Sequence, residues 1–329
     1  MGGVIWTPQQ RQEMQAYWKK HYGENISDRW HKLYQSMNGT YCKDYFPEML
    51  YTTRLEPRIN PDAYCRLFND KSLIETLYRA ADAEYRMPHT YLACCHGTLC
   101  DGSRNLLTQQ AALRLMHDVG ECVIKPTVET GSGKGVAVLN LRDGQDVRTG
   151  NSLEAILKGY GDAYIIQEKL KNSERIAAIN ASSLNTIRLI TYIIEDQVKN
   201  VPPVLRLGVD GNEVDNIHKG GLCIGVRDDG CLLKTAWQLG YGDTATQFKQ
   251  HPDSGIVFDG YYIGDIAKVI EVGKALHRMT PHVGMISWDL TLDHHDEVVL
   301  IEATASRRAC GSPRLSTGSP CSARIPPTC

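Results

Sequence analysis

Short apolar runs of strand length dominate the chain from about residue 121 onward. They occupy residues 122–126, 163–170, 187–194, 204–209, 221–226, 285–292 and 298–303. Helical periodicity instead marks residues 8–22, 28–37, 71–85, 152–158 and 265–277, and two prolines mark residues 53–64 as a loop. Because several strands follow one another without a helix between them, the pattern predicts an α+β fold with antiparallel hairpins rather than an alternating parallel sheet.

A glycine-rich loop joins two of these runs. The first run ends at Lys125, and residues 136–139 have the β-branched character of a second strand. The loop between them carries small residues and one lysine: Gly131, Ser132, Gly133, Lys134 and Gly135. Small residues let backbone N–H groups approach an anion, and both lysines add positive charge, so the loop predicts a phosphate-rich ligand.

Two interpretations of this loop remain after one class is excluded. A Walker-type phosphate loop needs Ser or Thr after its lysine and a helix directly behind it, whereas Lys134 is followed by Gly135 and then by a strand. The element is therefore either a hairpin that folds over a nucleotide or a plain hairpin turn.

A second predicted hairpin carries one carboxylate on each strand. If residues 294–297 form a four-residue loop, Asp293 pairs with Val298, and Asp289 lies opposite Glu302 on the same face. Opposed like charges destabilise a sheet unless they are neutralised, and Mg²⁺ is commonly held by one or two carboxylates plus substrate phosphates. The pair predicts a magnesium site; the alternative is that one carboxylate faces solvent. The polar tip at residues 294–297 is interpreted as a solvated turn, because a zinc site needs ligands from separated elements.

Length, charge and composition narrow the class of protein. The 329 residues, of which 42% are hydrophobic, suffice for a large core, and we expect two or three lobes. A net charge of −2 gives no electrostatic reason to expect nucleic acid as a partner. No run approaches the length of a membrane span and the first residues lack a signal-peptide pattern, so we expect a cytoplasmic chain whose 11 cysteines are reduced. The oligomeric state is not predicted.

The order of several short motifs resembles the ATP-grasp superfamily. These motifs are Asp70-Lys71 at a helix start, Lys125-Pro126 at a strand end, the glycine-rich loop, residues 167–170, and the pair Asp289 and Glu302. More narrowly, residues 183–188, 205–208, 214–216 with 220–221, and 287–289 resemble the sugar-transfer-associated ATP-grasp branch. The resemblance extends from about residue 65 to residue 303, and it depends on the number and order of the motifs.

The resemblance implies two α+β subdomains that clasp ATP, together with a helical N-terminal region. The implied boundaries are residues 1–70 for the helical region, 71–168 for the lid subdomain with the glycine-rich loop, and 169–302 for the C-terminal subdomain with the metal site. The implied enzyme is an ATP-dependent carboxylate-amine ligase: ATP phosphorylates a carboxylate to an acyl phosphate, and an amine then attacks it to give an amide, ADP and phosphate. The expected substrates are a small-molecule carboxylate and an amine, free or sugar-linked.

The same resemblance assigns a nucleotide-binding role to several residues. Lys71 and Lys125 hold the phosphates of ATP, and the glycine-rich loop closes over them. The hinge between the subdomains, whose backbone meets the adenine edge, comprises Gln167, Glu168, Lys169 and Leu170. Glu168 or Glu174 then contacts the adenine or the ribose.

Metal and substrate roles are implied in the same way. Asp289 and Glu302 hold the Mg²⁺ ion, and Arg188 and Arg206 grip the γ-phosphate, the acceptor carboxylate or the acyl phosphate. The alternative for Arg188 is a structural ion pair. A substrate or phosphate loop is implied at Asp215, Asn216, Gly220 and Gly221, although turn chemistry also favours Asn and Gly there.

Two features depart from the family pattern. Where the family usually has Glu-x-Asn, this chain has Glu302-Ala303-Thr304, and a hydroxyl is a poorer metal ligand than an amide carbonyl. Residues 303–329 form an atypical tail rich in Ser, Pro and Arg, which we expect to be disordered and interpret as the product of a shifted reading frame or as an artefact of the cloned sequence. Three other functions stay open: a peptide ligase of natural-product biosynthesis, a nucleotide-binding protein without turnover, and a phosphotransferase acting on a hydroxyl.

Overall fold

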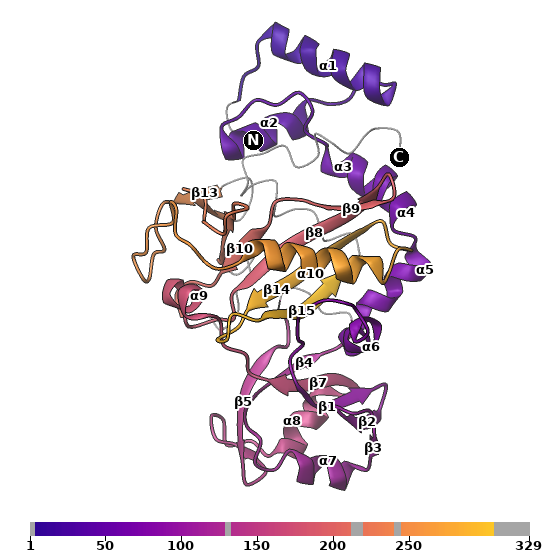
Figure 1. Cartoon of the computed structure of the whole chain (residues 1–329), viewed down its shortest axis with the longest axis vertical. Coiled ribbons are helices and arrows are strands. Elements are labelled where there is room, and N and C mark those ends of the chain that lie inside the picture. The colour runs from indigo at the N-terminus through magenta and orange to yellow at the C-terminus, as the bar shows by residue number, and fades with distance from the viewer. Residues whose placement is uncertain (1–3, 129–132, 212–219, 240–244, 306–329) are drawn as a thin grey trace.

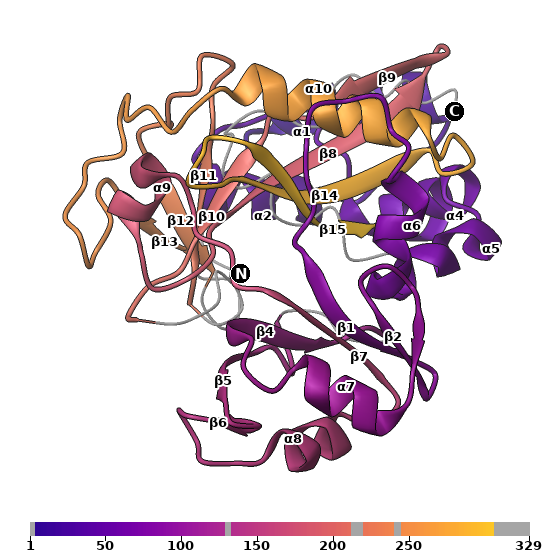
Figure 2. The same cartoon turned by 60° about the horizontal axis from the view of Figure 1, so that its bottom comes forward.

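Two antiparallel sheets and a helical N-terminal region make up the computed structural model of the chain, which describes residues 4–128, 133–211, 220–239 and 245–305. In Figure 1 the larger sheet lies in the middle of the molecule, the smaller sheet below it and the first two helices above it. Figure 2 shows the smaller sheet beneath the larger one, with α7 and α8 on its far side. The predicted α+β fold with antiparallel hairpins is confirmed.

The smaller sheet spans residues 90–168. Among the described residues its strand order is β3-β2-β1-β7-β4-β5-β6. The strands are β1 (Thr90–Cys95), β2 (Thr98–Asp101), β3 (Leu106–Leu107), β4 (Gly120–Pro126), β5 (Ala137–Arg142), β6 (Gln145–Asp146) and β7 (Ala163–Glu168). Its helices are α7 (Gln109–Leu115) and α8 (Leu153–Tyr160), which pack on the outer face. Ser152 accepts a hydrogen bond from the backbone N–H of Ala155, and this cap starts α8 where the sequence predicts a helix.

The larger sheet follows it in the chain. Among the described residues its order is β13-β12-β11-β10-β8-β14-β15, with β9 paired to β8. The strands are β8 (Thr186–Ile194), β9 (Gln197–Asn200), β10 (Val204–Leu207), β11 (Leu222–Gly225), β12 (Ala236–Leu239), β13 (Ala245–Phe248), β14 (Met285–Leu292) and β15 (Val298–Thr304). Helix α9 (Glu174–Ile179) precedes β8, and α10 (Ile266–Arg278), capped by Asp265, packs with Leu189 and Trp288 on one face.

The opposite face of the larger sheet is shared between two neighbours. Ile190 and Met285 lie on that face beneath Tyr51 and Leu55 of the N-terminal region. Side chains alternate between faces along a strand, so Arg188 on β8 and Asp289 on β14 share the face of Ile190 and Met285. The charged part of the face is thus next to the helical region and opposite the smaller sheet.

The N-terminal region is more helical than its sequence predicts. Its elements are α1 (Pro8–Tyr22), α2 (Arg29–Asn38), α3 (Glu48–Leu50), the π-helical turn η1 (Tyr51–Leu55), α4 (Glu56–Ile59), α5 (Asp62–Cys65) and the 3₁₀ turn η2 (Arg66–Asn69). The helices predicted over residues 8–22 and 28–37 are confirmed. The loop predicted over residues 53–64 is wrong: Pro57 lies just behind the π-helical turn η1, which runs into α4 without a break, and Pro61 directly precedes α5, where its fixed φ favours a helix start.

The prediction of a single helix over residues 71–85 is also wrong, because the helical segment ends at Tyr78. A 3₁₀ turn, η3 (Lys71–Leu73), leads into α6 (Ile74–Tyr78), and the chain then turns so that Arg86 pairs with Val299 of β15. Tertiary pairing thus ends the helix early. Ile74 and Tyr78 pack in the core of the larger sheet, whereas the boundary implied at residue 71 places them in the lid subdomain.

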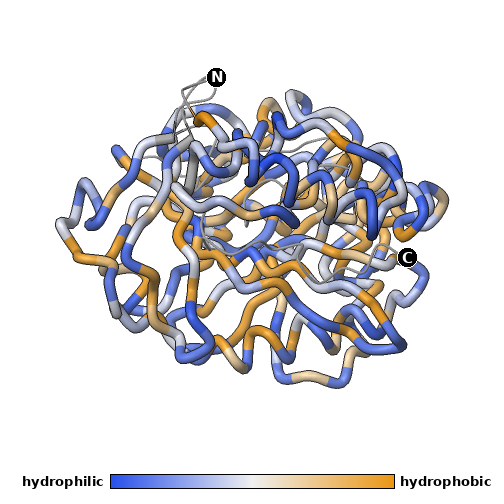
Figure 3. Tube along the Cα trace, turned by 90° about the horizontal axis from the view of Figure 1, so that it is seen from above, coloured by the Kyte–Doolittle hydropathy of each residue, from blue (hydrophilic) through white to orange (hydrophobic). Residues whose placement is uncertain are grey.

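Two further expectations concern the ends and the surface of the chain. Strand β15 reaches Thr304 and Ala305 is buried, so the expected disordered tail begins too early; residues 306–329 lie outside the described part. All eight cysteines in the described part are free thiols. Hydrophobic and hydrophilic stretches alternate along the trace in Figure 3, and no helix formed by the described residues has the length and apolarity to cross a membrane.

Candidate nucleotide site

A cavity of about 600 Å³ lies between the two sheets. Strands β4 and β5 line it from the smaller sheet, β8, β10, β14 and β15 line it from the larger sheet, and residues 167–172 connect the two. A cavity of this size accommodates a small organic ligand. It therefore gathers residues that the sequence separates by more than two hundred positions.

The inner end of the cavity holds two lysines beside a carboxylate. The ammonium group of Lys71 lies 3.4 Å from Glu302 Oε1, and the backbone N–H of Lys71 donates to the carbonyl of Thr127 at 2.9 Å, directly behind β4. The second lysine is Lys125 near the end of β4, which also lines the cavity. Burial lowers the pKa of Lys125 to about 8; Glu302 opposes this shift and Lys71 adds to it. Two cations close together in a partly desolvated site are typical of an anion-binding pocket.

Asp289 is held by two arginines. Arg188 binds both of its carboxylate oxygens, the second at 3.0 Å from Nη2, and Arg206 Nη1 lies 3.3 Å from Oδ2. Burial alone would raise the pKa of Asp289, but the charges of Arg188 and Arg206 outweigh it and lower the pKa. Arg206 and Asp289 line the cavity, whereas Arg188 is not among its described lining residues. The ion-pair alternative for Arg188 is therefore present in the structure.

The β14–β15 hairpin places Asp289 opposite Glu302, as the sequence predicts, but its loop length and strand register differ from the prediction. The tip is a three-residue loop in which the N–H of Asp293 donates to the carbonyl of Glu297, with Asp296 at a φ of 59°. The predicted pairing of Asp293 with Val298 is wrong, because Val298 pairs with Leu292. A bulge at Ile301 then shifts the register by one residue.

The bulge changes which side chains reach the cavity. Ile301 has no partner in the strand register, and both it and the following Glu302 line the cavity. A regular strand would direct neighbouring side chains to opposite faces, whereas a bulge re-aims one of them. One strand end thus supplies an apolar surface and a carboxylate together. Thr304, where the resemblance leads one to expect Asn, pairs with Ser287 and is half-buried.

An apolar slot adjoins this charged end. Aliphatic side chains from both sheets and from the hinge line it: Val123, Val136, Val138, Leu170, Leu184 and Ile301. These residues, except Leu170, are not predicted from the sequence, because an apolar strand residue that lines a ligand slot looks the same in sequence as one that fills a core. These side chains give part of the cavity wall an apolar character.

The glycine-rich loop is only partly described. Gly131 and Ser132 lie outside the described residues, whereas Gly133 and Lys134 line the cavity. Gly135 has a φ of 76°, and a Cβ atom there would lie 2.8 Å from Pro126 Cγ at the end of β4. Only glycine fits this close approach without strain. The loop therefore returns directly over the strand that carries Lys125.

Residues 167–170, the predicted hinge, line the cavity but differ in what their side chains contact. Gln167 donates to Thr90 Oγ1 at 3.1 Å, and Lys169 pairs with Glu121 at 2.8 Å. The Glu168 carboxylate accepts from Arg86 and from the backbone N–H of His89. Leu170 and Glu174 also line the cavity, Glu174 from the first turn of α9.

The implied substrate loop is only partly described, and its described residues do not line the cavity. Asp215 and Asn216 lie outside the described residues. Gly220 and Gly221 are described, but neither is among the lining residues, and the Gly220 carbonyl accepts from Gln238 Nε2 at 2.5 Å. The part of the loop that is described leads into β11.

Comparison with protein families identifies the fold. The model of the family described as sugar-transfer associated ATP-grasp matches residues 50–320. The chain belongs to the sugar-transfer associated ATP-grasp family. None of the curated proteins matches the chain.

Several solved structures are similar to this sugar-transfer associated ATP-grasp protein. N5-carboxyaminoimidazole synthase from Aspergillus clavatus, in complex with ADP, is 11% identical over 74% of this chain and 46% of its own, with a TM-score of 0.39. VanG D-Ala:D-Ser ligase from Enterococcus faecalis is 12% identical over 78% and 60%, with a TM-score of 0.45. L-amino acid ligase from Bacillus licheniformis is 15% identical over 76% and 43%, with a TM-score of 0.38. The chain spans about half the length of these structures.

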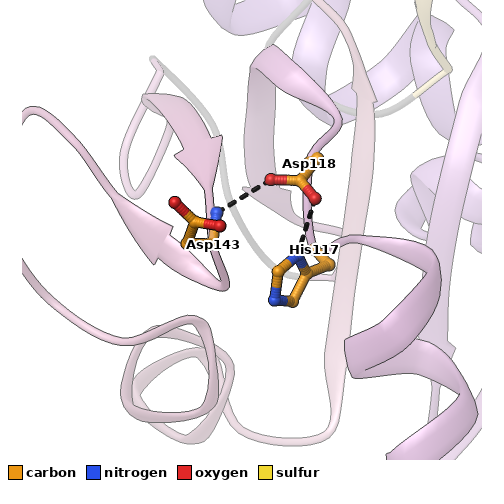
Figure 4. Close-up of side chains that lie close together, drawn as sticks. All are labelled: His117, Asp118 and Asp143. Carbon is orange, nitrogen blue, oxygen red and sulfur yellow. Dashed lines mark hydrogen bonds and ion pairs between the residues drawn. The ribbon is translucent and has the colours of Figure 1, made fainter.

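A second group of potential metal ligands lies outside the cavity of this ATP-grasp protein. His117, Asp118 and Asp143 lie close together and exposed where the turn after α7 meets the turn after β5 (Figure 4). Asp118 accepts from the backbone N–H of Asp143 at 2.8 Å and pairs with His117 at 2.7 Å. These contacts account for the cluster as a link between two turns.

Proposed function

We propose that this protein is an ATP-dependent carboxylate-amine ligase that acts through an acyl phosphate. The observation that supports this proposal is the cavity, whose lining combines the apolar slot with lysines, an arginine and carboxylates. Among the described lining residues, six cationic side chains accompany four carboxylates, an excess of positive charge that suits a polyphosphate. Family membership supports ATP as the nucleotide, and the family description supports a sugar or glycan precursor among the substrates.

The donor set also fits a magnesium ion. Asp289 and Glu302 offer carboxylate oxygens from adjacent strands, and hard oxygen ligands are what Mg²⁺ prefers. In this proposal these two residues hold the ion, which, when bound, neutralises charge on the transferring phosphoryl group. Both carboxylates already face cations, so nucleotide phosphates and Mg²⁺ would have to rearrange the pairs with Arg206 and Lys71.

The other residues bind and orient the nucleotide. The adenine ring occupies the apolar slot, and the backbone of residues 167–170 meets its edge. Lys71 and Lys125 bind phosphate oxygens, and Lys134 closes over them with the glycine-rich loop. Arg206 binds the γ-phosphate or the acceptor carboxylate, whereas Arg188 acts through Asp289, whose position it fixes.

The proposed reaction consists of two transfers. An oxygen of the acceptor carboxylate attacks the γ-phosphorus, and ADP leaves. The amine nitrogen then attacks the acyl carbon, inorganic phosphate leaves, and the nitrogen loses a proton, so that amide, ADP and phosphate are formed. Closure of the two sheets around the acyl phosphate excludes water that would hydrolyse it.

Calorimetric titration of ATP, with and without Mg²⁺, tests the nucleotide site. We expect Mg²⁺-dependent binding in the micromolar range by the wild type and tighter binding by the Thr304→Asn variant, because an amide carbonyl is the better metal ligand. The carboxylate and amine substrates are then screened by ADP release. Hydroxylamine should trap the intermediate, since it reacts with an acyl phosphate and not with a phosphate ester.

The outcomes separate the remaining candidates. ADP release without trapping would favour a phosphotransferase acting on a hydroxyl. ATP binding without ADP release with any carboxylate would favour a nucleotide-binding protein without turnover, a candidate suggested by the neutral Thr304 and the arginine-bound Asp289. Absence of ATP binding by both the wild type and Thr304→Asn would contradict the nucleotide site itself.

The lowered pKa of Lys125 predicts a pH dependence of ATP binding. In the free protein the pKa of Lys125 is about 8, and bound phosphates would raise it, so above pH 8 the complex holds more protons than its free components. Affinity should therefore be highest below pH 8 and fall as the pH rises. At pH 8.5, binding should take up as much as about three quarters of a proton, the fraction expected for a pKa of about 8.

This uptake can be measured by calorimetry in buffers with different ionisation enthalpies. The Lys125→Arg variant is the matched control, because arginine stays charged in both states. An uptake that persists in Lys125→Arg, or that is absent from the wild type, would contradict the assignment of Lys125.

A further inference from the structure

Both connections between the two sheets are attached to the β14–β15 hairpin. On the first connection, the N–H of Arg86 donates to the Val298 carbonyl, and the N–H of Leu300 donates to the Arg86 carbonyl, each at 2.9 Å. On the second, the N–H of Ser173 donates to the Leu292 carbonyl at 2.8 Å, and Asn172 forms a bridge with Asp293. Both connections are thus held by backbone contacts to the hairpin that carries Asp289 and Glu302.

The side chain of Arg86 joins the two connections to each other. Its Nε donates to Asp293 Oδ2 at 2.8 Å, and its Nη1 donates to Glu168 Oε1. Asp293 is fully buried, and its other oxygen accepts the N–H groups of His295 and Glu297 at 2.9 and 3.0 Å. One half-buried guanidinium therefore holds the hinge carboxylate on one side and the tip of the metal hairpin on the other.

Glu168 is fixed from two directions. The oxygen that binds Arg86 also accepts the N–H of His89 at 2.9 Å, and the backbone N–H of Glu168 donates to the His89 carbonyl at 2.9 Å. Through these contacts the Glu168 carboxylate stabilises the position of the hinge relative to Arg86 and His89. In this proposal the backbone of Lys169 and Leu170, which follow β7 and line the cavity, meets the base.

We propose that Arg86 is a positioning residue of the nucleotide site: by holding Glu168 and Asp293 together, it fixes the hinge that meets the base relative to the strands that carry Asp289 and Glu302. This inference rests on the proposed function. In this proposal Arg86 and Glu168 together affect binding of the base through the position of the hinge, whereas the lysines bind the phosphates. A planar guanidinium with several donors suits this double contact, whereas a glutamine side chain cannot replace it.

A double-mutant cycle tests the proposal. The variants are Arg86→Gln, Glu168→Gln and the pair, and the measurement is the Kd of Mg²⁺-ATP and of inorganic tripolyphosphate, which lacks the base. We expect each single change to weaken ATP binding by about tenfold and the double change to weaken it no further, as for two residues in one network. Tripolyphosphate binding should change less than about twofold, since the phosphate lysines are unaffected.

Arg175→Gln is the matched control. It removes an exposed ion pair of 3.3 Å between an arginine and Asp296 at the same hairpin tip, and ATP binding should be unchanged. Because Arg86→Gln leaves the buried Asp293 without its cation, an unfolded variant would be replaced by Arg86→Lys, whose ammonium cannot serve both carboxylates in the same geometry.

The possible failures differ from one another. Effects that multiply to about a hundredfold in the double variant would show that Glu168 acts on the nucleotide independently and would overturn the proposal. So would an equal loss of tripolyphosphate affinity, which indicates general damage. If the wild type bound tripolyphosphate but showed no preference for ATP, the hinge assignment would fail alone; if it bound neither, the proposed function would fail as well.

Discussion

Replacing Asp289 by asparagine should abolish most Mg²⁺-dependent ADP formation and also destabilise the fold. The carboxylate is a proposed magnesium ligand, and loss of its charge should reduce turnover by about 1,000-fold, equivalent to about 4 kcal/mol of transition-state stabilisation. It is also the common partner of Arg188 and Arg206, whose side chains are each 15% exposed. Weakening the ion pairs that these two largely buried guanidinium groups form with Asp289 should cost about 3 kcal/mol of unfolding free energy.

The two effects need separate measurements. ADP formation is followed in a coupled assay, and stability by urea denaturation of the nucleotide-free protein. The control is Asp296→Asn, the same chemical change at the exposed tip of the same hairpin, which should alter neither quantity. Full turnover by Asp289→Asn would remove the residue from the metal site, and unchanged stability would show that its ion pairs contribute no net free energy.

Replacing Lys125 by methionine should weaken ATP binding by about 100-fold without destabilising the free protein. A hydrogen bond from an ammonium to a phosphate contributes about 1.5–3 kcal/mol, and the partly desolvated site places this contact at the upper end of the range. In the free protein, burial and Lys71 both disfavour the charged ammonium, as its lowered pKa shows. An apolar side chain of similar length removes that cost, so the free energy of unfolding should be unchanged or higher.

This combination distinguishes a binding residue from a structural one. Calorimetry gives the ATP affinity and urea denaturation gives the stability of the free protein. Lys158→Met, on the exposed surface of α8 in the same sheet, is the matched control and should leave ATP affinity unchanged. Wild-type affinity in Lys125→Met, or a loss of affinity explained by unfolding, would contradict the role of Lys125.

The elements that sequence reasoning placed correctly are those determined by neighbouring residues. Helices α1, α8 and α10 directly follow Thr7, Ser152 and Asp265, each of which caps its helix through its own side chain. The β14–β15 hairpin itself follows from two apolar runs and the polar tip between them, but Asp289 lies opposite Glu302 only because the three-residue loop and the bulge at Ile301 offset each other. Local patterning likewise predicts the strands on either side of the glycine-rich loop, β4 and β5, which pair with each other.

The sequence by itself determined the fold class, the family and the pair of strands that present the two carboxylates. Only the tertiary structure decided that a bulge directs Ile301 into the cavity, that Arg188 holds Asp289, and that Arg86 connects Glu168 to the distant Asp293. The physical reason is the range of the interactions. Capping, turn chemistry and strand alternation act over a few residues, whereas these contacts join residues about 80 to 200 positions apart and form only when the sheets pack together.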